Sequence, residues 1–277
     1  MVKQSDERAF DIYLFLLKES DDSGQKKLNF NYDSAAQYLG INKQMDRTAY
    51  RRQIIKVLTK LQDEYKIIKF KPEYAKDAVI TLIDPEKSDE DEDNEYFELP
   101  IDYFKFGWNK TLSMRAKFCY LINLVNAAQS DNQPFWSKNV ENIRAQFGNI
   151  GRDVIAKGMD ELHRKNLIEV RYDDLDNNFQ DRLPKTYKVL QPYDFEKLLN
   201  TLTEIEKKHG TPEYKKALVY AEIVFEEYNP EVIKDIILKT KQYGETKIKE
   251  AFEIVKKKNF DNPKRKYTYV VGILENL

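Results

Sequence analysis

Cysteine and histidine are nearly absent from this chain of 277 residues, which contains one Cys and two His. The single cysteine, Cys119, excludes a disulfide scaffold and a zinc cluster built on cysteines. His163 and His209 stand far apart in the sequence, so zinc or paired-histidine chemistry lacks closely spaced ligands. We expect both histidines to lie on helix surfaces and Cys119 to be a buried, inert thiol.

Phosphate-binding glycine loops and long apolar runs are also missing. The sequence contains no GxxxxGK[ST] or GxGxxG pattern, and its acidic stretch lacks the Gly and Glu positions of an EF-hand calcium loop. We therefore expect no catalysis, no cofactor and no metal. No apolar run approaches the roughly 20 residues of a membrane span. Because the first ten residues are charged and lack a signal peptide's apolar core, we expect a cytoplasmic protein with no membrane partner.

The net charge of −1 conceals an uneven distribution of 46 basic and 47 acidic residues. Residues 86–98 (EKSDEDEDNEYFE) carry a net charge of −7, so the rest of the chain carries +6. Since Pro85 and Pro100 flank this acidic run, the composition predicts a solvated linker. The alternative is a regulatory segment that competes with DNA for basic surfaces by mimicking phosphates.

The same order of predicted elements occurs twice before residue 193. In the first half, apolar spacing predicts helices over 6–20, 32–41 and 43–65, then strands over 65–72 and 77–84. In the second half, it predicts helices over 113–128, 137–148 and 153–166, then strands over 167–173 and 183–190. Gly40 and Gly148 suit left-handed positions after the second helix of each set. This order is that of a winged helix-turn-helix.

Beyond Tyr193 the composition changes to helical patterns rich in Glu, Lys, Ala and Ile. The predicted helices cover 194–210, 211–229, 230–244, 245–259 and 266–277. We therefore predict a mainly α fold with small β-wings, of the α+β class. Its expected domains are a first winged helix-turn-helix (1–85), an acidic linker (86–98), a second winged helix-turn-helix (99–192) and a helical domain (193–277).

The third helix of the first module is the strongest candidate for contacting DNA, because this helix enters the major groove in helix-turn-helix proteins. Opposite the apolar stripe of Tyr50, Ile54 and Leu58, its polar face contains Lys43, Gln44, Arg47, Thr48, Arg51 and Arg52. Arg and Gln suit bidentate base contacts, while Lys and Thr commonly hold phosphates. A basic wing is predicted from Lys66, Lys69, Lys71 and Lys76. The alternative is a solvated basic helix face.

The second module offers a smaller basic set on and before its third helix. Its candidate DNA contacts are Asn149, Arg152, Lys157 and Arg164. The acidic residue Asp153 lies on the same helix, next to Arg152. Its loop, DDLDNNFQDR, is acidic, whereas a wing that grips phosphates should be basic. The second module is therefore equally well explained as a protein-contact or dimerisation module.

Several stretches resemble replication proteins. LPIDYFKFGWNKTLSMRAKFCYLINL, FWSKNVENIRAQFG and LIEVRY resemble the winged-helix modules of bacterial, phage and plasmid replication proteins. IKEAFEIVKKKNFDNPKRKYTYVVGILENL is similar to the end of DnaD-like domains of Gram-positive primosome and replisome-organiser proteins. That family ends in a Tyr-x3-Ile-x3-Trp motif, and Tyr269, Ile273 and Leu277 match its spacing with Leu in place of Trp. The resemblance implies that this motif contributes to DNA binding and oligomerisation.

The basic segment before this motif is a further candidate DNA contact. Lys264, Arg265 and Lys266 precede Tyr267 and Tyr269, a combination suited to phosphate contact and base stacking on single or distorted strands. The alternative is a core stripe that packs the terminal helix, and both roles are compatible.

The resemblance implies a non-catalytic DNA-binding protein of replication initiation, either an origin binder or a primosome or helicase-loading organiser. Its expected partners are double-stranded DNA, with single-stranded DNA, further copies of the chain and a replicative helicase or its loader as additional candidates. A winged-helix transcriptional regulator with a helical dimerisation tail is the main alternative. A winged-helix scaffold that binds only proteins is the other.

Overall fold

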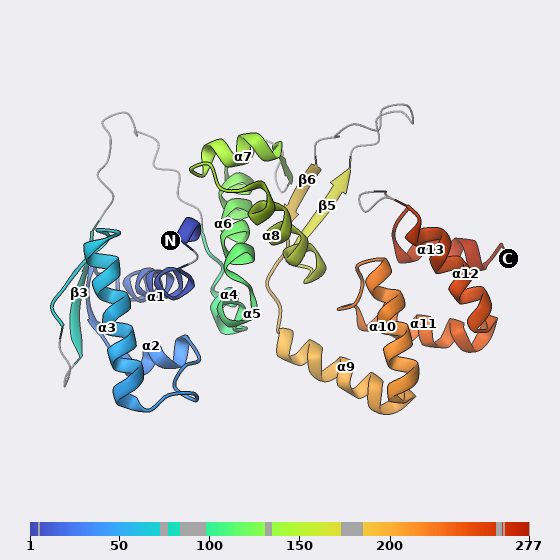
Figure 1. Cartoon of the computed structure of the whole chain (residues 1–277), viewed down its shortest axis with the longest axis horizontal. Helices are drawn as coiled ribbons and strands as arrows, with labels where there is room; N and C mark the ends of the chain where they lie inside the picture. Colours follow the sequence, from blue (N-terminus) through green and yellow to red (C-terminus); the bar gives the residue numbers. More distant parts are fainter. Residues whose placement is uncertain are drawn as a thin grey trace. The chain divides into compact units, whose positions relative to one another are not determined.

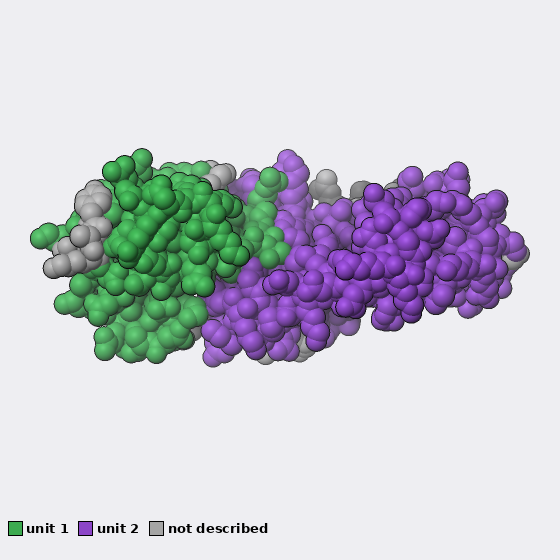
Figure 2. Space-filling model, turned by 90° about the horizontal axis from the view of Figure 1, so that it is seen from below, with its two compact units in different colours: residues 1–96, 109–118 green, residues 97–108, 119–277 purple. Residues whose placement is uncertain are grey.

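The computed structural model describes residues 1–4, 6–72, 77–83, 98–130, 135–172, 185–258, 262 and 264–276 (Figure 1). Lys76, most of the acidic run, the loop of the second predicted wing and Leu277 lie outside the described residues. The chain forms two compact units, residues 1–96 with 109–118 and residues 97–108 with 119–277 (Figure 2). It is mainly helical with two small antiparallel sheets of three strands, as expected for the α+β class.

The first repeat lies in unit 1, and its described residues form three α-helices, one short 3-10 helix (η1) and one sheet. Its elements are η1 (Val2–Gln4), α1 (Glu7–Ser23), β1 (Lys27–Phe30), α2 (Tyr32–Tyr38), α3 (Arg47–Asp63), β2 (Ile68–Phe70) and β3 (Ala78–Leu82). The sheet order is β1-β3-β2. The side chains of Asp6, Asn31 and Asp46 cap α1, α2 and α3 by accepting backbone N–H groups.

The core of the first repeat forms where the helices meet one face of this sheet. Burial alternates along β1, so that Leu28 and Phe30 face the core. The predicted stripe of α3 is confirmed, since Tyr50, Ile54, Leu58 and Leu61 are buried in the same cluster. In α1, whose sequence places Phe10, Leu14 and Leu17 on one face, Phe10 and Leu14 are buried, whereas Leu17 is 40% exposed.

The start of the third helix differs from the prediction. α3 begins at Arg47 rather than Lys43, because Asp46 caps it and accepts the N–H of Ala49 at 3.0 Å. The preceding residues form a turn in which the N–H groups of Gln44 and Met45 donate to the carbonyl of Ile41. Lys43 and Gln44 therefore precede the helix instead of lying on it.

The second repeat has the same order of elements and the same sheet order. It contains α6 (Met114–Ala128), β4 (Phe135–Ser137), α7 (Val140–Gln146), α8 (Arg152–Arg164), β5 (Ile168–Tyr172) and β6 (Lys185–Val189), with strands ordered β4-β6-β5. Two short helices, α4 (Ile101–Lys105) and α5 (Trp108–Thr111), precede it. α6 begins among residues of unit 1 and ends in unit 2. Ser137, expected to start a helix, lies in β4 because Asn139 caps α7.

A buried ion pair holds the start of α6 against α1 within unit 1. The Lys117 ammonium, whose side chain is 2% exposed, contacts the two Asp11 carboxylate oxygens at 2.7 and 2.9 Å and Glu7 at 2.8 Å. Burial raises the pKa of Asp11 to about 6, while Lys117 opposes this rise.

The helical domain follows the second repeat in unit 2. Its helices are α9 (Phe195–His209), α10 (Thr211–Ile223), α11 (Pro230–Tyr243), α12 (Glu245–Lys256) and α13 (Tyr267–Leu274), packed around one apolar cluster. α10 ends earlier than predicted, and Phe225 beyond it adopts a left-handed φ of 62°. None of the helices in the described part of the chain combines the length and apolar character needed to cross a bilayer.

Candidate nucleic-acid interface

One face of α3 presents polar and basic side chains to solvent. Thr48, Arg52 and Lys56 are spaced four residues apart, so they lie on one helical face, and all three are exposed. Lys56 was not among the contacts predicted for this helix, all of which lie nearer the start of α3 or in the turn before it. Lys43 and Gln44, also exposed, stand in the turn before α3.

Two predicted base-contacting arginines are instead engaged with α2. The Arg47 guanidinium donates to both Asp33 carboxylate oxygens, at 2.8 and 3.4 Å. The Tyr50 hydroxyl donates to the same carboxylate at 2.7 Å, and together these donors hold the pKa of Asp33 below its usual range. The Arg51 guanidinium lies 4.7 Å from the centre of the Tyr32 ring. Arg47 and Arg51 therefore stabilise the α2–α3 packing in this structure.

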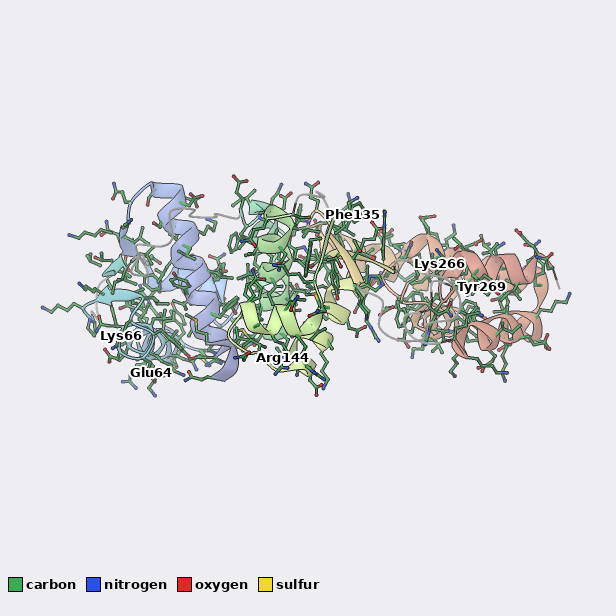
Figure 3. The ribbon with its side chains drawn as sticks, turned by 90° about the horizontal axis from the view of Figure 1, so that it is seen from above. Glu64, Lys66, Phe135, Arg144, Lys266 and Tyr269 are labelled. Carbon is green, nitrogen blue, oxygen red and sulfur yellow. The ribbon has the colours of Figure 1, made fainter. Side chains whose placement is uncertain are left out.

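The outer face of the first sheet carries further lysines. Lys27 and Lys69 pair with Thr81 from opposite sides in the register of the sheet, and both lysines are exposed. Lys66, exposed and with a φ of 56°, precedes β2 (Figure 3). Lys71, also exposed, follows β2. The face therefore offers several phosphate-binding groups beside one another.

In the second repeat, acidic neighbours bind part of the predicted basic set. Glu141 lies between two arginines, 2.5 Å from Arg152 and 2.6 Å from Arg144, which is labelled in Figure 3. Lys157 is exposed, and Asn149 is exposed with a left-handed φ of 57°. The cationic surface of α8 is therefore weaker than that of α3.

A cationic cluster around Phe135 was missed by the sequence analysis. The Arg171 guanidinium lies 4.2 Å from the centre of the ring of Phe135, which is labelled in Figure 3, and the Lys188 ammonium lies 5.5 Å from the same centre. Glu169 partly neutralises this cluster, 2.7 Å from Arg171. The sequence does not predict this cluster, because β4 is too short to show the alternation typical of a strand. The three side chains come together only when β4 pairs with β6.

At the C-terminal motif, aromatic and basic side chains also meet. The ammonium groups of Lys258 and Lys264 lie 5.2 and 5.9 Å from the centre of the Tyr269 ring. Tyr269, labelled with Lys266 in Figure 3, also packs with Ile273 against the helical core. Packing of the motif against the core is therefore confirmed for the two motif residues that the structure describes.

The three neighbouring basic residues of this segment have different environments. Lys264 and Lys266 are exposed. Arg265 donates to the carbonyls of Ile223 at 3.0 Å and Lys258 at 3.2 Å, so it fastens the segment to the end of α10. DNA contact by these residues stays a prediction, with the two lysines better placed for it than Arg265.

The histidines and the cysteine lie apart from one another in different helices. No cluster of three or more His, Cys, Asp or Glu side chains that could hold a metal occurs among them. His163 and His209 lie in the last turns of α8 and α9. Cys119 is fully buried, and burial raises the pKa of its thiol to about 12, which confirms the expected buried thiol and disfavours the reactive thiolate.

Comparisons with known proteins give no relative. No protein-family model matches the chain, and no curated protein or solved structure matches it.

Proposed function

We propose that this protein binds DNA through paired winged helix-turn-helix modules and acts, without catalysis, in the initiation of DNA replication. The observation that carries the DNA-binding part is the exposed face of Thr48, Arg52 and Lys56 on the third helix of the first repeat. Support for the module type comes from the order of elements and the 1-3-2 strand order, which occur in both repeats. In helix-turn-helix proteins this helix enters the major groove.

In the proposed complex, each group of the first repeat has a distinct task. Arg52 has the geometry for a bidentate contact with guanine, while Thr48 and Lys56 hold phosphates. Lys43 and Gln44 contact the duplex from the turn before α3, and Lys69 and Lys71 contact a flanking phosphate strand. The whole-chain charge of −1 gives a single copy little long-range attraction to DNA, so we propose that several copies bind together.

The second repeat and the helical domain are proposed to assemble copies or recruit a helicase or its loader. The charge-paired surface around Glu141, Arg144 and Arg152 supports a protein contact in preference to phosphate binding. The aromatic–cationic cluster of Tyr269, Lys258 and Lys264 supports an additional contact with single or distorted strands.

A salt titration with a matched pair of variants tests DNA binding by the α3 face. Fluorescence anisotropy measures the affinity of the full chain for labelled duplexes between about 50 and 200 mM salt. Arg52→Gln with Lys56→Gln should weaken binding and reduce the slope of log K against log salt by about 0.9, because Lys56 is the phosphate contact of the pair and each lost phosphate contact contributes about 0.9. The variant should also lose sequence preference, since Arg52 contacts a base. A reduction of about 1.8 with sequence preference unchanged would assign both side chains to phosphates.

The control removes the same charge elsewhere. Lys207→Gln with Lys208→Gln changes two exposed lysines of α9 and should leave the slope unchanged. Circular dichroism melting checks that both variants fold. If the wild-type chain binds no DNA at about 50 mM salt, or if both double variants bind alike, the proposed DNA interface is wrong.

The replication role is tested by stoichiometry on long DNA. An initiator or organiser should add copies as a duplex bearing repeated sites is lengthened, whereas a transcriptional regulator should saturate as one dimer on a palindromic site. Sedimentation of the chain with duplexes of increasing length separates these outcomes. Saturation at one dimer would favour the regulator.

A further inference from the structure

A groove between α10 and α12 combines an apolar floor with a basic rim. It encloses about 340 Å³ within the helical domain. The floor is formed by Val219, Tyr220 and Ile223 of α10. The rim is formed by Lys215, Lys216, Lys249 and Lys256 together with Glu253. Tyr220 and Ile223 also pack against the core of the domain, while Val219 and the rim residues belong neither to that core nor to the proposed DNA interface.

The floor suits an apolar side chain better than a nucleic-acid base. Val219 is 58% exposed, and Ile223 lies one helical turn further along the same face. Tyr220 is stacked against Phe252, with ring centres 4.7 Å apart and an interplanar angle of 25°. Because Phe252 covers one face of the Tyr220 ring, the exposed floor is mostly aliphatic. Single-stranded nucleic acids bind by stacking their bases on exposed aromatic faces, which this floor offers only in part.

The rim carries an excess of positive charge. Lys216 pairs with Glu245 at 2.9 Å, and Lys256 pairs with Glu253 at 3.6 Å. Two further lysines, Lys215 and Lys249, are exposed on the rim. Four ammonium groups therefore face two carboxylates. A ligand with carboxylates around an apolar anchor complements both rim and floor.

The acidic run of this chain has that chemistry. Residues 86–98 carry a net charge of −7, and most of the acidic residues in this run directly precede Tyr96 and Phe97. The stripe of α10 from Lys215 to Ile223 is about 12 Å long, at 1.5 Å per residue. This length accommodates about four residues of extended peptide, enough for an aromatic anchor with flanking acids.

We propose that the groove between α10 and α12 binds residues 86–98 of a second copy of this chain. An aromatic side chain of that copy fills the floor, and its carboxylates contact the rim lysines. Because the groove and the acidic run are different surfaces, the contact is heterologous and each copy can bind a further one. The interaction requires no DNA, so it can be tested independently of the proposed function.

The first test measures peptide binding. The probe is a fluorescein-labelled peptide with the sequence of residues 86–98, and the receptor is the full chain with the eight acids of its own run changed to Asn or Gln. We expect saturable binding that weakens with salt. Lys215→Glu with Lys249→Glu should reduce affinity about tenfold or more, equivalent to about 1.4 kcal/mol.

Matched variants separate the two parts of the groove from general charge effects. Lys207→Glu with Lys208→Glu makes the same charge change on α9, and this variant should bind the peptide with the same affinity as the unchanged receptor. Val219→Ser should weaken binding through the floor while preserving the rim. A peptide with Ser in place of Tyr96 and Phe97 should bind weakly to every receptor.

The second test mixes complementary copies in sedimentation velocity. One variant has the acids of residues 86–98 neutralised and retains an intact groove. The other carries Lys215→Glu and Lys249→Glu in the groove and retains the acidic residues 86–98. Each should associate less than the wild type when alone, and an equimolar mixture should form a heterodimer. The wild-type chain should grow in mass with concentration.

Four outcomes would overturn the proposal. The first is equal peptide affinity in the groove and α9 variants. The second comes from repeating the binding measurement with labelled oligothymidine: if the groove variant loses affinity for oligothymidine and not for the peptide, the groove is a single-strand site. The third is a mixture of complementary copies that stays monomeric, and the fourth is peptide binding by a wild-type chain that shows no concentration-dependent association. Either of the last two would exclude a second copy as the source.

Discussion

Removing the buried Lys117 ammonium should destabilise unit 1 severely. In the structure this ammonium contacts both oxygens of Asp11 and one of Glu7, at distances between 2.7 and 2.9 Å. The Lys117→Met substitution retains a long apolar side chain but leaves the Asp11 carboxylate, itself 10% exposed, without its charged partner. The lost interaction is therefore mainly electrostatic, with little change in packing.

The expected cost follows from the burial of both partners. Breaking a buried ion pair by removing one member costs about 3–5 kcal/mol, because an uncompensated charge remains. An exposed pair contributes only about 0–1 kcal/mol. For a unit of about 100 residues, each kcal/mol lowers the melting temperature by about 4–8 °C, so the variant should melt at least about 12 °C lower.

The penalty should also depend on pH. Burial raises the folded-state pKa of Asp11 to about 6 even with Lys117 present, so removal of Lys117 raises this pKa further. A carboxyl group whose folded pKa lies above its unfolded value contributes stability that is present below the unfolded pKa. That stability is lost as pH rises through the folded pKa. The variant should therefore be weakened more at pH 8 than at pH 5, where protonated Asp11 is neutral.

Urea unfolding followed by circular dichroism at both pH values measures this effect. Lys18→Met is the control, since Lys18 forms an exposed pair with Asp22 on the same helix as Asp11. The double variant Lys117→Met with Asp11→Leu should regain most of the lost stability, because no charge remains buried. A loss below about 1 kcal/mol, or one equal at both pH values, would refute this account of the ion pair.

Three smaller effects follow from single side chains. Alkylation of Cys119 at pH 8 should be much slower in the folded protein than in urea, and equal rates would contradict its burial and raised pKa. Asp46→Ala should cost about 1 kcal/mol in urea unfolding, because the N-cap of α3 is lost, while Asp46→Asn should be nearly neutral. Tyr267→Phe should cost about 1 kcal/mol, because its hydroxyl donates to Asp235 at 2.8 Å, and an unchanged midpoint would argue against that bond.

Helices with long apolar stripes and the strands β2, β3, β5 and β6 could be predicted from the sequence, whereas β1 and β4 could not. The stripe of α3 lies where its spacing predicts, because burial of one helical face is a local property of the pattern. β1 and β4 contain four and three residues, too few for a period of two to be recognised. Each becomes a strand through pairing with β3 or β6, which lie far away in the sequence.

The contacts of individual side chains could not be predicted from the sequence, because they too depend on partners in other elements of the chain. A helical pattern places Arg47 on the polar side of α3, but it contains no information about Asp33, which reaches that side from α2. The face that we propose for DNA is consequently displaced toward the middle of the helix, where Arg52 and Lys56 are exposed. An Arg47→Ala variant should therefore affect the α2–α3 packing as well as any DNA contact. Arg52→Gln changes an exposed side chain that has no comparable ion pair or ring contact among the described residues. A comparison of unfolding and DNA affinity in these two variants therefore separates packing from recognition.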